Sequence, residues 1–289
     1  MVQILWFWKK WFCKDHTQGL LALFSAALTL VLGAYSAPAA AQSSDPGFAA
    51  VLAQPPQVLL LGEQHDAADH PALHADAVRR LIANGQLAAL VLEMADAGQT
   101  TGQNTGKDTR AVPKTGADAD VQAALAWNTQ AWDWSRYAPS VMAAVRAGVP
   151  VVGANLPRKE MPTAMKNAAA SALFTTANWQ KQLQNIRTGH CDMLPEAQIE
   201  PMARVQVARD ESMARVLAAH VQTAKTVVLI AGSFHTDEAL GVPAQLKNSH
   251  PDLSVQTIRW PEVDTGKDYC AEFRQQMQQK PQKSQKLKP

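Results

Sequence analysis

The sequence predicts an α/β fold in which a mostly parallel sheet is flanked by helices. Two observations predict this class. Five short apolar runs are separated by longer segments with helical periodicity, which is the pattern of repeated β-α-β units. Four of these runs end directly in polar residues although their interiors are apolar, as is typical of buried parallel strands. Because ligands of such sheets bind beyond the carboxyl ends of the strands, the same pattern predicts where a functional site lies.

The first predicted strand covers residues 58–61 and runs into Gly62-Glu63-Gln64-His65. The glycine turns the chain off the strand end, so His65 is expected in the loop beyond it. Residues 71–83 have the pattern of a helix, and the following Asn84-Gly85 is a typical helix end. These elements form the first half of a β-α-β unit.

The later strands are predicted at residues 88–92, 149–152, 226–231 and 253–258, the last of them at an edge of the sheet. The second strand delivers Glu93, and the third delivers Asn155 and Arg158. The fourth runs into Gly232-Ser233-Phe234-His235, a second copy of the Gly-x-x-His pattern. We therefore expect two histidines and several polar groups at one rim of the sheet.

Helical patterns over residues 121–147, 160–186 and 195–220 are longer than simple strand crossovers require. They predict a helical subdomain inserted between strands. Residues 98–120 are rich in Gly, Thr and Asp and poor in apolar side chains, so we expect a flexible insertion there, either a lid over the rim or a surface loop.

The N-terminal residues 1–41 have the pattern of a secretory signal peptide. Lysines precede an uncharged stretch, and Ala39-Ala40-Ala41 supplies small residues before Gln42. An aromatic cluster at residues 6–12 leaves an uncleaved membrane anchor as the alternative. We expect an exported protein located in the periplasm or cell envelope.

The remaining chain is long enough for one large domain, expected over residues 42–273. Its formal charge is close to zero, because the net charge of +2 is carried by three lysines and one aspartate within residues 1–41. This balance argues against a nucleic-acid partner. Residues 274–289 hold basic side chains and no acid, and we expect a basic disordered tail there.

Two cysteines, Cys191 and Cys270, follow the expected signal peptide. In an oxidising compartment a disulfide between them is the simplest prediction. The alternative is that Cys191, which lies between His190 and Asp192, belongs to a metal site or acts as a nucleophile.

The side chains expected at the rim are of the types that catalyse hydrolysis. His65, His235, Glu63 and Glu93 are candidate ligands of one divalent metal ion, with a glutamate as the base that takes a proton from water. Arg158 is the candidate that steadies an oxyanion. Simple hydrogen bonding between neighbouring strand ends is the alternative.

Gln206, Arg209 and Asp210 fall near one face of the predicted helix at residues 195–220. A contact between Gln206 and Asp210, four residues apart, is the preferred explanation of this spacing. A position facing the rim is the alternative.

Several segments, in this order, resemble the ChaN family. They are residues 60–66, 92–94, 132–139, 155–158, 232–235 and 241–243. The resemblance implies membership of a superfamily shared with Tiki proteases and a fold similar to erythromycin esterase. It also implies haem binding at a bacterial envelope, in a homodimer that encloses stacked haems with tyrosine ligands, and an outer-membrane uptake partner.

Only Tyr137 and Tyr269 follow residue 41, so a tyrosinate haem ligand must be one of them. Tyr137 is the better candidate, because Trp132 and Trp134 offer ring planes to a porphyrin and Arg136 offers a partner for a propionate. The same spacing is equally typical of a helical core stripe.

The sequence departs from the family where Gln42, rather than an acylated cysteine, follows the expected cleavage point, so a lipoprotein is not expected. The Tiki relatives imply the alternative function, a metal-dependent peptidase or esterase that uses both Gly-x-x-His motifs. A haem-binding protein of iron acquisition remains the first expectation.

Overall fold

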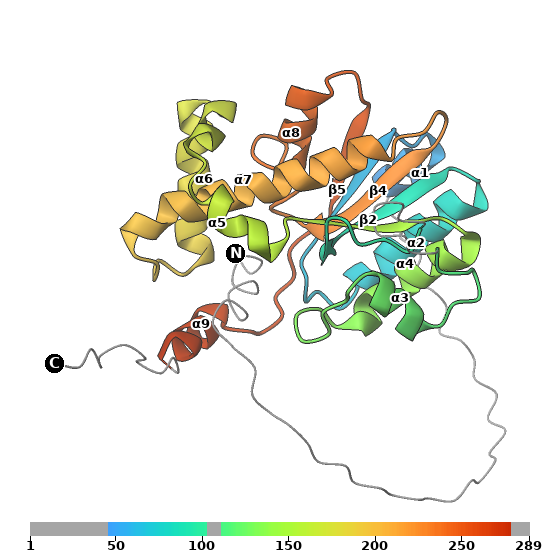
Figure 1. Ribbon diagram of the computed structural model, residues 1–289, viewed down its shortest axis with the longest axis horizontal. Helices are drawn as coiled ribbons and strands as arrows, with labels where there is room; N and C mark the ends of the chain where they lie inside the picture. Colours follow the sequence, from blue (N-terminus) through green and yellow to red (C-terminus); the bar gives the residue numbers. More distant parts are fainter. Residues whose placement is uncertain (1–45, 103–110, 279–289) are drawn as a thin grey trace, which may run out of the picture.

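The computed structural model describes residues 46–102 and 111–278, which fold into three layers with a parallel sheet in the middle (Figure 1). The five strands are β1 (Val58–Glu63), β2 (Leu87–Asp96), β3 (Val151–Asn155), β4 (Thr226–Gly232) and β5 (Val255–Arg259). Their order in the sheet is β3-β2-β4-β1-β5, and all pairings are parallel. The predicted fold class, all five strands and the edge position of the last one are confirmed.

Helices cover both faces of the sheet. On one face lie α1 (Pro46–Ala53), α2 (His70–Ala83) and α4 (Trp134–Ala147), and on the other lie α7 (Glu196–Ala219) and α8 (Val242–Ser249). Successive residues of β1 serve the two faces in turn: Leu59 and Leu61 pack toward α2, whereas Val58 and Leu60 pack toward α7. Burial on both faces explains why the strands are apolar without interruption.

Of the three helical stretches expected to form a subdomain, the two at residues 160–186 and 195–220 lie between β3 and β4. The first, residues 121–147, lies between β2 and β3 and ends in α4, which packs on the sheet. The part between β3 and β4 contains short helical turns, α5 (Met161–Ala164), α6 (Thr176–Gly189) and the 24-residue α7. The C-terminal half of α7 packs on the sheet, and its N-terminal half extends past the strand ends, where it packs against α6 (Figure 1). The carboxyl ends of the strands are therefore covered by a long helix.

The segment after β2 lies along the outer edge of β3. Thr100 forms an antiparallel bridge with Val152, and the backbone N–H of Thr101 donates to the carbonyl of Val151 at 2.9 Å. Thr101 is buried, and α3 (Asp118–Ala124) follows further along. The first of these parts of the expected flexible insertion thus pairs with an otherwise open sheet edge, and the second is helical. Residues 103–110 lie outside the described part.

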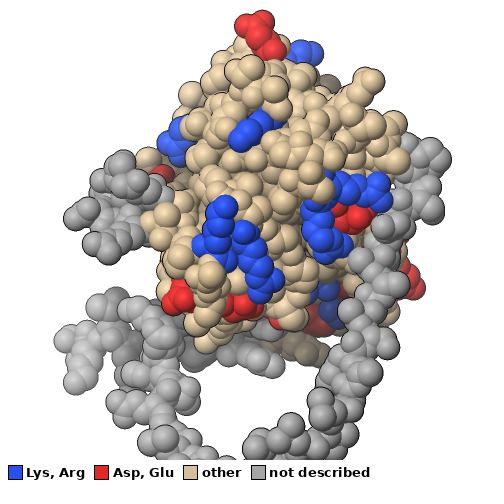
Figure 2. All heavy atoms as spheres, turned by 90° about the vertical axis from the view of Figure 1, so that its right-hand side faces the viewer, with Lys and Arg blue, Asp and Glu red and all other residues tan. Residues whose placement is uncertain are grey.

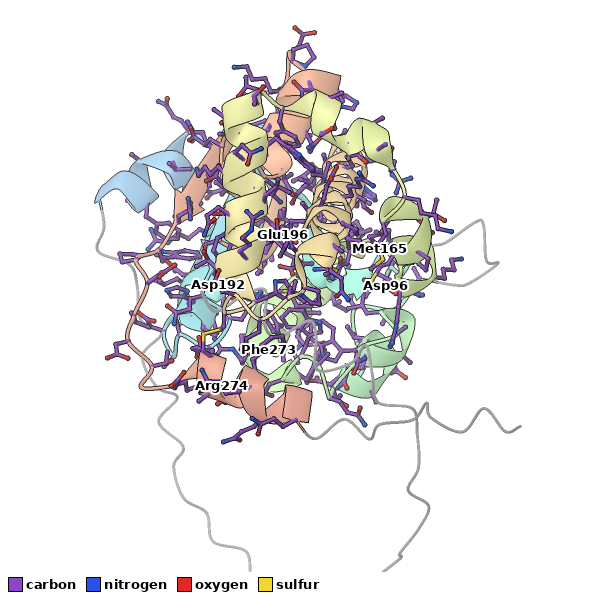
Figure 3. The ribbon with its side chains drawn as sticks, turned by 90° about the vertical axis from the view of Figure 1, so that its left-hand side faces the viewer. Asp96, Met165, Asp192, Glu196, Phe273 and Arg274 are labelled. Atoms are coloured by element: carbon purple, nitrogen blue, oxygen red, sulfur yellow. A yellow bond between two sulfur atoms is a disulfide. The ribbon has the colours of Figure 1, made fainter. Side chains whose placement is uncertain are left out.

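The predicted disulfide between Cys191 and Cys270 is present, with Cα atoms 5.6 Å apart. It joins the end of α6 to α9 (Tyr269–Gln278), as Figure 3 shows between the loop at Asp192 and the helix that carries Phe273 and Arg274. The start of the predicted disordered tail, from residue 274, is therefore helical as far as Gln278.

The expected signal peptide and residues 279–289 of the tail lie outside the described residues. In the part of the chain that is described, no helix has both the length and the hydrophobicity needed to span a membrane.

Candidate functional site

The two Gly-x-x-His motifs lie side by side because β1 pairs with β4. They are offset by one residue: Glu63 pairs with Gly232, and Gly62 pairs with Ala231. A Cβ atom on Gly62 would lie 2.4 Å from the hydroxyl oxygen of Thr236, so only glycine allows the second motif to approach the first this closely. The offset brings both histidines to the same carboxylate.

That carboxylate is Glu93 of β2, which lies between the two imidazoles. His65 Nε2 is 3.7 Å from one carboxylate oxygen of Glu93, and His235 Nε2 is 3.4 Å from the other. The backbone N–H of Gly232 donates to Glu93 at 2.7 Å. All of these side chains are less than 10% exposed. The predicted convergence of His65, His235 and Glu93 at the rim is therefore observed.

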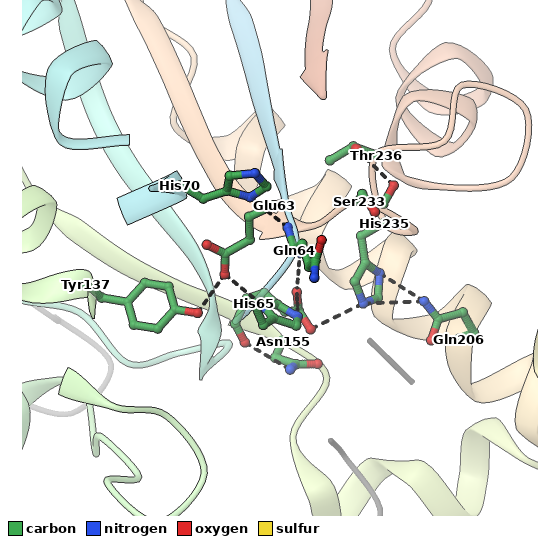
Figure 4. Close-up of polar contacts among 12 residues, drawn as sticks. Glu63, Gln64, His65, His70, Tyr137, Asn155, Gln206, Ser233, His235 and Thr236 are labelled. Atoms are coloured by element: carbon green, nitrogen blue, oxygen red, sulfur yellow. Dashed lines mark hydrogen bonds and ion pairs between the residues drawn. The ribbon is translucent and has the colours of Figure 1, made fainter. Parts of the chain in front are cut away.

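Each histidine also contacts a second carboxylate through its other ring nitrogen, and Figure 4 shows that of His65, which is Glu63. Glu63 lies 2.7 Å from His65 Nδ1, and it accepts a hydrogen bond from the Tyr137 hydroxyl at 2.6 Å. Asp210 of α7 lies 2.5 Å from His235 Nδ1. The result is a buried chain of alternating acids and imidazoles, which we call the rim network: Glu63, His65, Glu93, His235 and Asp210.

Residues from neighbouring helices support the rim network. The Gln206 amide is 3.2 Å from His235 Nδ1, and His74 Nδ1 is 3.4 Å from the second oxygen of Glu63. The ring of Trp132 packs edge-on against His65, with centroids 4.9 Å apart. These contacts fix the orientation of both histidines.

A segment near the C-terminus closes over the first motif. The Gln64 amide donates to the carbonyl of Val263 at 3.0 Å and accepts from its N–H at 2.8 Å. Lys267 lies 3.4 Å from Asp66. We call residues 260–268, which connect β5 to α9, the strap. Because α9 carries Cys270, the disulfide holds one end of the strap in place.

The rim network changes the pKa values of its members. Burial alone would raise the pKa of Glu63, but His74 and the hydrogen bond to His65 outweigh burial and lower it to about 2. Burial would likewise raise the pKa of Glu93, and His235 and His65 instead hold it well below its usual range. Both glutamates are therefore ionised at neutral pH.

The pKa values of the two histidines are raised, whereas those of the two glutamates are lowered. Burial would lower the pKa of His235, but Glu93 and Asp210 raise it to about 9. The pKa of His65 is also raised, because the charges of Glu93 and Glu63 outweigh its burial. Burial raises the pKa of Asp210 to about 6. The rim network holds protons on its two imidazoles and negative charge on Glu93 between them and on Glu63 beside His65, so it can store or pass a proton inside the fold.

These shifts predict a loss of stability at alkaline pH. The pKa of His235 rises from 6.5 to about 9 on folding, so its contribution is complete below pH 6.5 and is lost as the pH rises through 9. The shift corresponds to at most about 3 kcal/mol. We expect the free energy of unfolding, measured with urea, to fall from about pH 7 to about pH 9.5, and to fall less in His235→Gln. Equal decreases in the two proteins would contradict this assignment.

Arg158, predicted to steady an oxyanion, is exposed on the short helical turn Arg158–Glu160 after β3, whereas the rim network is buried. The arginine near the rim network is Arg209 of α7, which is buried and interacts electrostatically with Glu93, Asp210 and Asp96. Burial lowers its pKa to about 10, so it remains charged at neutral pH.

Gln206 and Asp210, for which a contact with each other on the helix was the preferred explanation, both contact His235, as in the alternative of a position facing the rim. One signal pointed to this outcome. Asp210 lies seven residues from both Ala203 and Leu217, which are buried, so a carboxylate occupies a position in the apolar stripe of α7. A charge in such a stripe needs a buried partner.

The expected haem surface around Tyr137 is not open in the structure. Tyr137 and Trp132 belong to the hydrophobic core, and burial together with Glu63 raises the pKa of Tyr137 well above 10, which disfavours the tyrosinate. Trp134 donates to Asp118 at 2.8 Å, and Arg136 donates to the carbonyl of Ala67 at 2.7 Å. These four residues have packing and hydrogen-bonding roles, as in the alternative of a helical core stripe.

The metal-dependent alternative finds no support either. Among the described residues, no group of three or more His, Cys, Asp or Glu side chains is arranged to hold a metal ion. His65 and His235 each contact carboxylates through both ring nitrogens.

Comparison with known proteins places this geometry in a family. Residues 50–246 match the family model described as haem-binding uptake, Tiki superfamily, ChaN. A solved structure described as cofacial heme binding to ChaN of Campylobacter jejuni is similar with a TM-score of 0.61 and 23% sequence identity, over 77% of this chain and 88% of that chain. Comparison with curated protein sequences gives no match. Since the family model covers most of the chain, the protein belongs to the ChaN haem-binding uptake family of the Tiki superfamily.

Proposed function

We propose that this protein binds haem outside the bacterial cytoplasm, as part of haem or iron acquisition. The observation that carries the proposal is the match of residues 50–246 to a family described by haem-binding uptake. The disulfide between Cys191 and Cys270 supports export, because such bonds persist mainly in oxidising compartments. The signal-peptide pattern of residues 1–41 supports the same location, the periplasm or cell envelope.

We further propose that haem is held between two copies of the chain. Support comes from the Campylobacter jejuni ChaN structure, which is described by cofacial haem binding. Two haems that face one another are most simply enclosed by a homodimer, since each copy then shields one outer face. Membership of a haem-binding uptake family supports an outer-membrane protein as the partner with which haem is exchanged.

The test is a haem titration of the full chain, followed by visible absorption and by the molecular mass in solution. We expect a saturable Soret band shift with one haem per chain, accompanied by dimerisation. Absence of a saturable shift would overturn haem binding. Saturable binding to a protein that stays monomeric would overturn the dimer alone.

A further inference from the structure

We propose that the face of the molecule where the strands begin docks on an anionic lipid surface. This face lies at the opposite end of the sheet from the rim network, so the inference concerns a second surface and goes beyond haem binding. Four exposed cations define it, and we call them the basic face: Arg79 of α2, Arg146 of α4, Arg215 of α7 and Lys225 in the turn before β4.

The fold gathers these cations at one end of the molecule. Each helix that connects two parallel strands runs back along the sheet, so α2, α4 and α7 all end where the next strand begins (Figure 1). A cation in the last turn of a helix, such as Arg146 in α4, stabilises the helix dipole. The dipole does not account for Lys225, which lies outside the helices, or for Arg79 and Arg215, which precede the last turns of their helices. The basic face therefore exceeds what helix stability requires.

Nearby carboxylates do not neutralise the basic face. In the part of the chain that the structure describes, none of its four cations forms an ion pair with Asp or Glu. Asp76, on the same helix as Arg79, is already paired with Arg80 at 3.0 Å. Figure 2 shows this end of the molecule: Lys and Arg side chains gather across its middle, and most of the visible Asp and Glu side chains lie toward its margins. The basic face thus presents a positive potential to solvent.

The basic face has the composition of a lipid-binding surface rather than that of a protein interface. Protein interfaces centre on large apolar or aromatic side chains. Among the described residues, the exposed large hydrophobic side chains are Leu173 and Val263, which lie in the helical subdomain and in the strap. Both are outside the basic face. Exposed Lys and Arg without such anchors bind through charge, as they do at the headgroups of anionic lipids.

Docking by the basic face fixes how the molecule faces a membrane. The rim network and the strap lie at the other end of the strands, so they point away from the lipid (Figure 1). The location proposed above, outside the cytoplasm, brings the chain to bacterial membranes, which contain anionic phospholipids. The rim end of the molecule is then free to contact other molecules.

The test is sedimentation of the full chain with lipid vesicles, made either of phosphatidylcholine alone or with phosphatidylglycerol added. We expect saturable binding to the anionic vesicles that weakens as salt is added, because ions screen the charges. Equal binding to both kinds of vesicle, independent of salt, would overturn the inference, since it would report insertion of the apolar stretch within residues 1–41.

The basic-face variant, Arg79→Gln/Arg146→Gln/Lys225→Gln, removes three of the four charges. It keeps Arg215, because Glu211 on the same helix interacts electrostatically with that residue. Each basic side chain close to an anionic surface strengthens association by about fivefold. We therefore expect the variant to bind anionic vesicles at least about tenfold more weakly. Its melting temperature should stay close to that of the wild type, because all three side chains are exposed.

The matched control, Lys159→Gln/Lys166→Gln/Arg274→Gln, removes the same charge from exposed positions away from the basic face. Lys159 and Lys166 follow the carboxyl end of β3, and Arg274 lies on α9, on the side of the molecule that Figure 3 shows. The control should bind anionic vesicles like the wild type. Equal weakening in both variants would overturn docking by the basic face, because net charge alone would then govern binding.

Failure of the wild type to bind anionic vesicles would also overturn the inference. Polyglutamate then serves as a probe of acidic proteins, and binding that only the basic-face variant loses would identify an acidic protein, instead of lipid, as the partner. Haem is absent from these measurements, so their failure leaves the proposed function intact.

Discussion

Replacement of Glu93 by glutamine is expected to lower the free energy of unfolding by about 3–5 kcal/mol near neutral pH, the usual cost of breaking a buried ion pair. Glu93 is the only carboxylate of the rim network that contacts both imidazoles. Glutamine keeps the shape and can still accept the hydrogen bond from the Gly232 N–H, so the variant removes charge and little else.

The loss should increase as the pH falls. In the variant, no negative charge lies between His65 and His235. Protonation of these buried imidazoles at lower pH then destabilises the folded state, because each positive charge lacks its partner and repels the other. Urea unfolding at several pH values measures this. The matched control is Glu200→Gln, which removes an exposed partner of Arg204 on α7 and should cost less than about 1 kcal/mol. Equal stability of Glu93→Gln and Glu200→Gln would show that the rim network is not an electrostatic unit.

Removal of the disulfide by Cys191→Ser and Cys270→Ser is expected to cost about 4 kcal/mol. The two residues are separated by 79 positions, and closing a loop of that length restricts the unfolded chain by about this amount. The double variant should also free α9 and loosen the strap, which would expose Gln64 and Val263.

Calorimetry of the double variant and of the wild type in reductant checks this prediction, and both should melt at the same lower temperature. Hydrogen exchange should increase first in the strap and α9. An unchanged melting temperature would show that packing of Phe273 and the contacts of the strap hold this end of the chain without the disulfide.

The sheet could be predicted because its strands are buried on both faces. The runs that begin at Val58 and Thr226 are buried throughout, and each leads into the glycine of a motif. The rim residues Glu63, His65, Glu93 and His235 could be predicted for the same reason, since parallel strands place their ends together.

The side chains that contact the rim residues could not be predicted from the sequence in the same way. Asp210 reaches His235 only because α7 crosses the strand ends. No pattern in the neighbouring residues predicts that crossing. Tyr137 has the spacing of both a ligand and a core residue, and its orientation toward Glu63 depends on how α4 packs on α2. Glu93 lies within β2 and is buried, whereas Arg158 lies on a short helical turn beyond the end of β3 and is exposed.

The central position of β4 determines when the molecule can fold. β1 pairs only with β4 and β5, so it has no strand neighbour until the chain has been synthesised beyond Thr226. Contacts between positions so far apart form slowly, because a long loop must close before any pairing stabilises it. A nascent chain that ends within α7 therefore keeps its first strand unpaired. Late closure of the sheet would keep the chain unfolded during synthesis, which suits the export that we propose.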